Sequence, residues 1–131
     1  MARTIAYAGR RFQIAYAREK SGRSPGADFF DELPIEDKAK LMNLFRLMGD
    51  DGAIRNKEKL GVLGDGLFEF KSFQIRMPFG YAARERGVIL ITHGFVKKRD
   101  KAPKEEIDRA RRILREDQEE PGLAVVRKQG V

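Results

Sequence analysis

The chain has 131 residues, 41% hydrophobic and 36% charged, which is typical of one globular domain with a heavily charged surface. It has no cysteine, which excludes disulfides and thiolate metal sites, and its longest aliphatic run, VILI, is too short for a membrane span. Lysine and arginine number 27 against 20 aspartates and glutamates, and this net charge of +7 favours a polyanionic partner.

The two ends of the chain carry further expectations. The amino-terminal apolar stretch is too short for a signal peptide, so we expect a cytoplasmic protein with no membrane association. We expect a single domain over residues 1–119 and a flexible tail over residues 120–131.

Charge is unevenly distributed along the chain. Residues 28–51 hold three basic and seven acidic side chains, whereas residues 97–115 hold nine basic and four acidic ones. The chain therefore carries basic and acidic surfaces, although a single charged run is usually an ordinary solvated face.

The first half of the chain predicts one strand and two helices. Residues 10–18, RRFQIAYAR, alternate large apolar with smaller or polar side chains, as a half-buried strand does. Ser24 and Pro25 are typical of a helix start. After Pro34 a second helix is predicted, which Gly49 would end. Its apolar positions recur at helical spacing: Leu41, Leu44, Phe45 and Met48.

The second half predicts a loop, three strands and a helix. Residues 49–66 hold five glycines and many charges, which indicates a loop. Residues 67–73 and 74–82 alternate as strands, with a bulge or local edge expected at Pro78 because proline donates no backbone hydrogen bond. VILITHGF (88–95) is apolar on both sides, as a central strand is.

A last helix is predicted within PKEEIDRARRILRE, and its first-turn glutamates suit the helix dipole. The expected order is therefore β-α-α-β-β-β-α, an α+β fold with a small, mostly antiparallel sheet. We expect the helical hairpin on one face of this sheet. The polar side chains of the last three strands would then gather on the opposite, relatively open face.

Two cations are the first candidates for a functional site. Lys71 and Arg76 are polar positions on adjacent strands joined by a tight turn, so their side chains would lie next to each other on the open face. Two neighbouring cations favour an anion such as a phosphodiester. The alternative is that Glu69 or another acid simply pairs with them.

The end of the VILI strand carries the only histidine and a basic cluster. His93 is either an imidazole packed in the core, as the alternation with Ile89 and Ile91 suggests, or a general acid or base. The cluster after it is a weakly specific phosphate-binding loop. Its members are Lys97, Lys98, Arg99 and Lys101.

We expect no metal or other cofactor, because one histidine and no cysteine leave few ligands. One alternative is a magnesium nuclease. Glu69, Phe70 and Lys71 form an E-x-K tripeptide of the kind that some nucleases combine with an upstream aspartate. Here the upstream candidates are Asp65, four residues before Glu69, and Asp51, and neither is convincingly placed.

Three segments resemble a known family. SPGADFFDELP, LGDGLFEFKS and above all ILITHGFVKKRDKAPKEEIDRARRIL are similar to the phage-derived Gp49-like toxins of the RelE/HigB-type toxin–antitoxin superfamily. The resemblance covers roughly residues 10–116. Its most specific part is a strand followed by H-G-F-x-K-K, a proline linker and a helix with E-I-x-x-A.

The resemblance implies a RelE-like fold and a metal-independent endoribonuclease that cuts mRNA, often on the ribosome, with a helix-turn-helix antitoxin as partner. In that chemistry the 2′-hydroxyl of the RNA attacks the adjacent phosphate. Lys71, Arg76 and His93 would be catalytic, and the basic cluster would bind RNA. Pro78 and Gly80 depart from the family's usual strand, and the last helix lacks a tyrosine near its end. A catalytically silent module that binds RNA or ribosomes is therefore the alternative.

Overall fold

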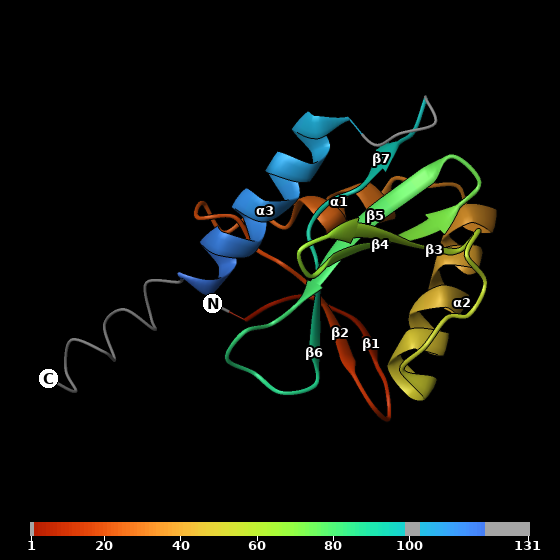
Figure 1. Ribbon diagram of the computed structural model, residues 1–131, viewed down its shortest axis with the longest axis horizontal. Helices are drawn as coiled ribbons and strands as arrows, with labels where there is room; N and C mark the ends of the chain where they lie inside the picture. The colour runs from red at the N-terminus through yellow and green to blue at the C-terminus, as the bar shows by residue number, and fades with distance from the viewer. Residues whose placement is uncertain (1, 99–102, 120–131) are drawn as a thin grey trace, which may run out of the picture.

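The computed structural model describes residues 2–98 and 103–119, which form three helices and one twisted sheet (Figure 1). The expected tail, residues 120–131, and the basic residues Arg99 and Lys101 lie outside this part. In chain order the elements are β1 (Ile5–Ala8), β2 (Gln13–Tyr16), α1 (Pro25–Asp31), α2 (Ile35–Asp51), β3 (Leu60–Gly64), β4 (Leu67–Ser72), β5 (Ile75–Tyr81), β6 (Val88–Ile91), β7 (Phe95–Val96) and α3 (Lys104–Gln118).

The α+β class and the mostly antiparallel sheet are confirmed, but the expected order lacked three strands. The sheet runs β1-β2-β6-β5-β4-β3, and β7 adds to β5 beyond the end of β6. All pairings are antiparallel except β2 with β6. β6 lies between β2 and β5 and all four of its residues are buried, as an apolar central strand requires.

The predicted loop over residues 49–66 is the largest error in the sequence-based prediction. α2 continues through Gly49 to Asp51 and ends at Gly52, whose left-handed φ of 74° suits glycine. Gly49 serves close packing instead, because a Cβ there would lie 2.8 Å from Cδ2 of the Tyr7 ring. β3 then occupies Leu60–Gly64 and pairs with β4. Two of its five residues are glycines, which hides the strand from alternation.

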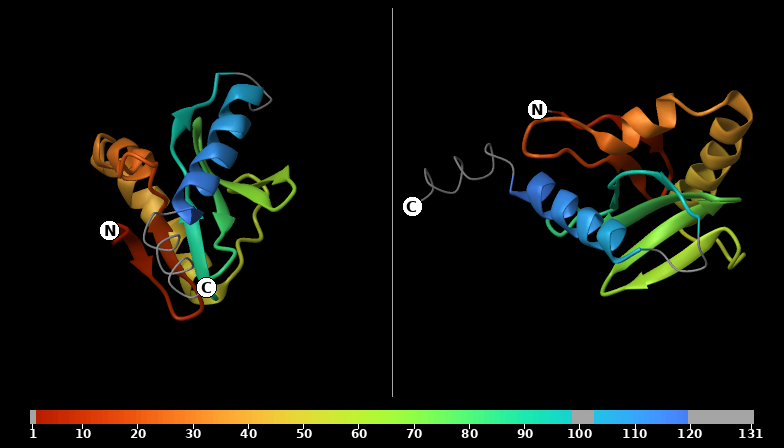
Figure 2. Two further views of the ribbon diagram at one scale, coloured as in Figure 1. Left: turned by 90° about the vertical axis from the view of Figure 1, so that its left-hand side faces the viewer. Right: turned by 90° about the horizontal axis from the view of Figure 1, so that it is seen from above.

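The helices cover both faces of the sheet (Figure 2). α1 and α2 pack on one face, where Phe45 of α2 contacts Phe70 of the sheet and Phe70 stacks on Phe79. α3 packs on the other face, with Ile113 buried against β2 and β6. Leu114 of α3 sits over Gly80, where a Cβ would lie 2.9 Å from its Cδ1. The face that we expected to be open is therefore partly covered.

The strand pairing is interrupted opposite Pro78. β5 itself is continuous through this proline, but its neighbour β6 ends at Ile91 and β7 starts only at Phe95. Ile91 pairs with Phe79, on the α2 side, whereas Phe95 pairs with Arg76, on the opposite side. The alternation that grouped His93 with Ile91 and Phe95 is therefore broken by a slip of one position between the two strands, although His93 is buried as that grouping suggested.

Within residues 2–98 and 103–119, no helix is long and apolar enough to cross a membrane. The amino-terminal segment is attached to the far end of α3, because Arg3 shares its Nε–H between both carboxylate oxygens of the buried Asp117 and donates a further hydrogen bond from Nη2 to Oδ1. Asp117 also accepts a hydrogen bond from the backbone N–H of Arg18. This contact fixes α3 across the sheet and thereby fixes the position of its first turn.

Candidate nucleic-acid interface

The β4–β5 hairpin places Lys71 directly opposite Arg76, as expected. Residues opposite each other in an antiparallel pair share a face, with Cβ atoms about 5 Å apart. The same face carries Glu69, two positions before Lys71, and Phe95 of β7, opposite Arg76. A two-residue turn, Phe73 and Gln74, joins the strands. Two cations and one carboxylate are therefore held on one rigid hairpin.

Glu69 is the acid that sequence reasoning had left as a possible partner of the cations, and the structure shows that pairing. Its Oε2 lies 3.9 Å from Nε of Arg76, and the two side chains are only 7% and 12% exposed. Burial raises the pKa of Glu69 above its usual value, and the charges of Arg76, Lys97 and Lys71 oppose that rise. The carboxylate is therefore surrounded by three cations, each close enough to influence its ionisation.

The guanidinium of Arg76 is also held by the turn that precedes it. Nη1 donates hydrogen bonds to the carbonyls of Phe73, at 2.6 Å, and Ile75, at 2.9 Å. These contacts use donors of Arg76 without neutralising its charge. The arginine is fixed in direction, and within residues 2–98 and 103–119 its acidic partner is the poorly solvated Glu69.

β7 brings the second part of the basic region to this hairpin. The backbone N–H of Lys97 donates to the carbonyl of Gln74 at 2.6 Å, which ties the β4–β5 turn to the end of β7. Lys97 is half-buried and Lys98 is exposed. Of the four predicted RNA-binding residues, Lys97 thus contacts the hairpin turn and Lys98 follows it in the chain. Arg99 and Lys101 belong to the segment outside the described residues.

His93 is a packed histidine, which was one of the two interpretations of the sequence. Its side chain is 1% exposed, its Nδ1 lies 3.0 Å from Oγ1 of Thr92 and its Nε2 lies 3.0 Å from Oε1 of Glu106. Burial lowers the pKa of His93, and the hydrogen bond to Glu106 opposes that change. The imidazole stacks on Phe95 at a ring separation of 5.7 Å, and Phe95 is the strand partner of Arg76.

Glu106 is the residue of this region that sequence reasoning missed. It belongs to the first turn of α3, and only its place near a helix start had been noted. Its carboxylate is 26% exposed and connects α3 to the end of β6 through His93. No spacing in the sequence could have indicated this, because the contact spans 13 residues across a segment without a regular pattern.

The magnesium alternative finds no ligand set in the described ranges. There, no three histidine, aspartate or glutamate side chains gather as a metal site requires. Asp65 lies in the β3–β4 turn, where its side chain is 95% exposed and 3.9 Å from Arg111. Asp51 pairs with Arg10 at the end of α2. Glu69 has Arg76 as its charged neighbour instead of another acid.

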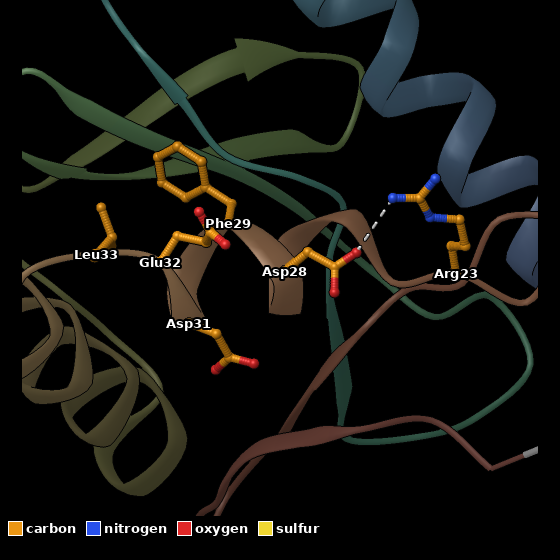
Figure 3. Close-up of a pocket in the computed structure, with 6 residues that line it drawn as sticks. All are labelled: Arg23, Asp28, Phe29, Asp31, Glu32 and Leu33. Atoms are coloured by element: carbon orange, nitrogen blue, oxygen red, sulfur yellow. Dashed lines mark ion pairs between the residues drawn. The ribbon is translucent and has the colours of Figure 1, made fainter.

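An acidic hollow is lined by residues of α1 and of the segments on either side of it, and none of the hairpin residues lines it (Figure 3). Its volume is about 720 Å³, and its one arginine, Arg23, is paired with Asp28 at 3.8 Å. Its negative charge suits a basic group and disfavours a phosphate. The lining residues are Arg23, Asp28, Phe29, Asp31, Glu32 and Leu33.

The family profile described as phage-derived protein Gp49-like matches residues 28–115, from α1 to within α3. The chain belongs to this family. The matched range of this Gp49-like protein contains the whole hairpin, His93 and Glu106, and it leaves out β1 and β2. No curated protein matches the chain.

Proposed function

We propose that this Gp49-like protein has a RelE-like fold and is the toxin of a type II toxin–antitoxin system. Its activity would be metal-independent endoribonucleolytic cleavage of mRNA bound to the ribosome. The observation that carries the proposal is the cation pair Lys71 and Arg76 on one rigid hairpin, with the charge of Lys97 acting on the same carboxylate. Family membership and the net charge of +7 support it.

In this reaction the protein needs no nucleophile of its own, because the 2′-hydroxyl of the RNA acts as the nucleophile. A 2′-hydroxyl loses its proton and attacks the adjacent phosphorus, and the 5′-oxygen leaves with a proton. Arg76 would hold the phosphate and stabilise the negative charge that develops on it, since a guanidinium stays charged and binds two oxygens. Lys71 would be a second clamp or the base. Lys97 and Lys98, and in the undescribed segment Arg99 and Lys101, would hold flanking phosphates.

His93 was expected to donate the proton to the leaving oxygen, but its buried position keeps the imidazole away from a substrate at the surface. With 1% exposure and both ring nitrogens near partners, the imidazole must move to reach RNA. We therefore propose that His93 positions the site by joining β6, Phe95 and the first turn of α3. Its catalytic role stays a prediction that the pH experiment in the Discussion tests.

A second candidate is a catalytically silent module that binds RNA or ribosomes. The observation that favours it is the engagement of Arg76 by Glu69 and by two carbonyls, together with the burial of His93. Induced expression in a bacterium separates the candidates. An active toxin arrests growth and leaves truncated transcripts, whereas a silent module leaves transcripts intact.

A second experiment tests the magnesium alternative. Purified protein that cleaves RNA equally well with and without EDTA would exclude it.

The partner would be a small antitoxin with a helix-turn-helix DNA-binding domain, encoded next to this chain. The acidic hollow on α1 and the basic hairpin site offer two surfaces of opposite charge for it. Co-expression with the product of the neighbouring gene, followed by affinity purification, tests this part. We expect a stable complex that restores growth, and recovery of the toxin alone would contradict it.

A further inference from the structure

Phe73 occupies a position that is unfavourable for it in two ways. It is the first residue of the β4–β5 turn and has a φ of 54°, in the left-handed region that glycine adopts without strain. Its side chain is also 75% exposed, and among the large apolar side chains of the described residues only Ile35 is more exposed. A strained backbone at an exposed aromatic residue is a reason to look for function.

The neighbours of Phe73 hold this strained turn in place. Nη1 of Arg76 donates to the Phe73 carbonyl at 2.6 Å, and the backbone N–H of Lys97 donates to the Gln74 carbonyl at the same distance. Nζ of Lys40, from the first half of α2, lies 4.2 Å from the centroid of the Phe73 ring. In Figure 1 the β4–β5 turn, the start of α2 and β7 lie at the same end of the molecule.

This arrangement places an aromatic ring beside Lys40 of α2, at the turn of the hairpin that carries Lys71 and Arg76. Lys71 and Arg76 flank the turn in sequence, and Lys40 covers one side of the ring. Because three quarters of the side chain is exposed, the other side of the ring remains accessible. Aromatic rings beside cations are how proteins bind single-stranded nucleic acid without reading its sequence, since every base has a face that stacks.

We propose that Phe73 stacks on a base of the single-stranded RNA substrate, next to the phosphate held by Lys71 and Arg76. This rests on the proposed function and adds a binding residue to it. The RNA crosses the end of the β4–β5 hairpin, with a phosphate on the face of Arg76 and the neighbouring base on Phe73. The local positive charge favours RNA over an apolar protein partner as the occupant.

A tryptophan probe tests stacking directly, because the chain has no tryptophan of its own. Phe73→Trp introduces a single indole at the turn, and Val62→Trp introduces one at an equally exposed position, 75%, on β3. We expect a uridine octamer to quench the fluorescence of the Phe73→Trp variant and an abasic octamer of the same length to quench it far less. The Val62→Trp variant should respond to neither. Equal quenching of the Phe73→Trp variant by both oligomers would overturn the stacking role.

Affinity measurements separate this inference from the proposed function. Phe73→Gly and Phe73→Leu should both weaken binding of the octamer about tenfold, the scale of one lost base–aromatic contact. The glycine variant should melt at an equal or higher temperature than the parent, since it relieves the left-handed strain. If the parent binds no RNA, the proposed function fails. If both variants bind as the parent does, or lose only the antitoxin, the role of Phe73 fails alone.

Discussion

Oε2 of Glu69 lies 3.9 Å from Nε of Arg76, and each of these side chains keeps a buried polar atom without a hydrogen bond in the described structure. Those atoms are Oε1 of Glu69 and Nε of Arg76 itself. The pair is thus close enough for charge attraction but not for good hydrogen bonding. Under the proposed function, a phosphate oxygen would compete with Glu69 for the guanidinium of Arg76.

Glu69→Gln should tighten RNA binding severalfold, because a negative charge 3.9 Å from Arg76 repels a phosphate bound at the same guanidinium. The substitution removes the anion that competes with phosphate and keeps the size of the side chain. Burial raises the pKa of Glu69 above its usual 4.5, so protonation removes the same charge as the pH falls. The affinity of the parent should therefore approach that of the variant at acidic pH. Fluorescence anisotropy with a labelled octamer measures both, and weaker binding by the variant would contradict this view.

Arg76→Ala should abolish toxicity and slow cleavage about a hundredfold or more, the usual scale for losing a group that stabilises developing charge. Arg10→Ala is the matched control, since Arg10 is 80% exposed and pairs with Asp51 at the other end of α2. Cleavage of a ribosome-bound message and colony counts after induction provide the readouts, with circular dichroism as the folding check. An Arg76→Ala protein that folds and kills like the parent would overturn the assignment.

The cation pair was predictable because it depends on local geometry. Strong alternation and a tight turn fix the register of β4 and β5, and that register alone puts Lys71 opposite Arg76. The central position of β6 was predictable for a similar reason, because a run of four apolar residues needs cover on both faces.

The missed elements lack such local signals. β3 carries two glycines among five residues and takes its strand form from pairing with β4. β7 has only two residues and depends on β5. The glycines make the strand propensity of β3 weak, whereas Phe95 and Val96 favour a strand but are too few to mark a separate element, so tertiary contacts decide both structures.

The chemistry of single side chains was the least predictable part. The bond from His93 to Glu106 joins β6 to α3, and the approach of Lys40 to Phe73 joins α2 to a turn. Both contacts depend on how the helices dock on the sheet. The strain at Phe73 was also invisible, because nothing in the neighbouring residues indicates a positive φ.

Lys97→Ala should weaken RNA binding with little effect on the cleavage rate at saturation. It should also reduce the salt dependence, because each lost phosphate contact on a single strand lowers the slope of log affinity against log salt by about 0.7. Titrations from about 50 to about 200 mM salt compare the parent, Lys97→Ala and the control Arg10→Ala. An affinity of the parent that stays constant over this range would contradict the basic-site proposal as a whole.

His93 should make the protein less stable at acidic pH. Burial lowers its pKa in the folded state below the usual 6.5, so the unfolded chain binds the proton more readily. The contribution of the neutral imidazole is therefore complete above pH 6.5 and is lost as the pH falls below it. The hydrogen bond to Glu106 and its charge oppose this lowering of the His93 pKa, whereas the charges of Arg109 and Arg112 add to it.

His93→Gln should lower the free energy of unfolding by about 1–3 kcal/mol at neutral pH, since it disturbs buried contacts to Thr92 and Glu106. It should also flatten the change in stability between about pH 7.5 and about pH 5.5, because the titrating group is gone. Urea unfolding at the two pH values measures both effects. If the variant instead keeps the stability of the parent, binds RNA equally well and cleaves it more slowly, His93 is a proton donor and its positioning role is wrong.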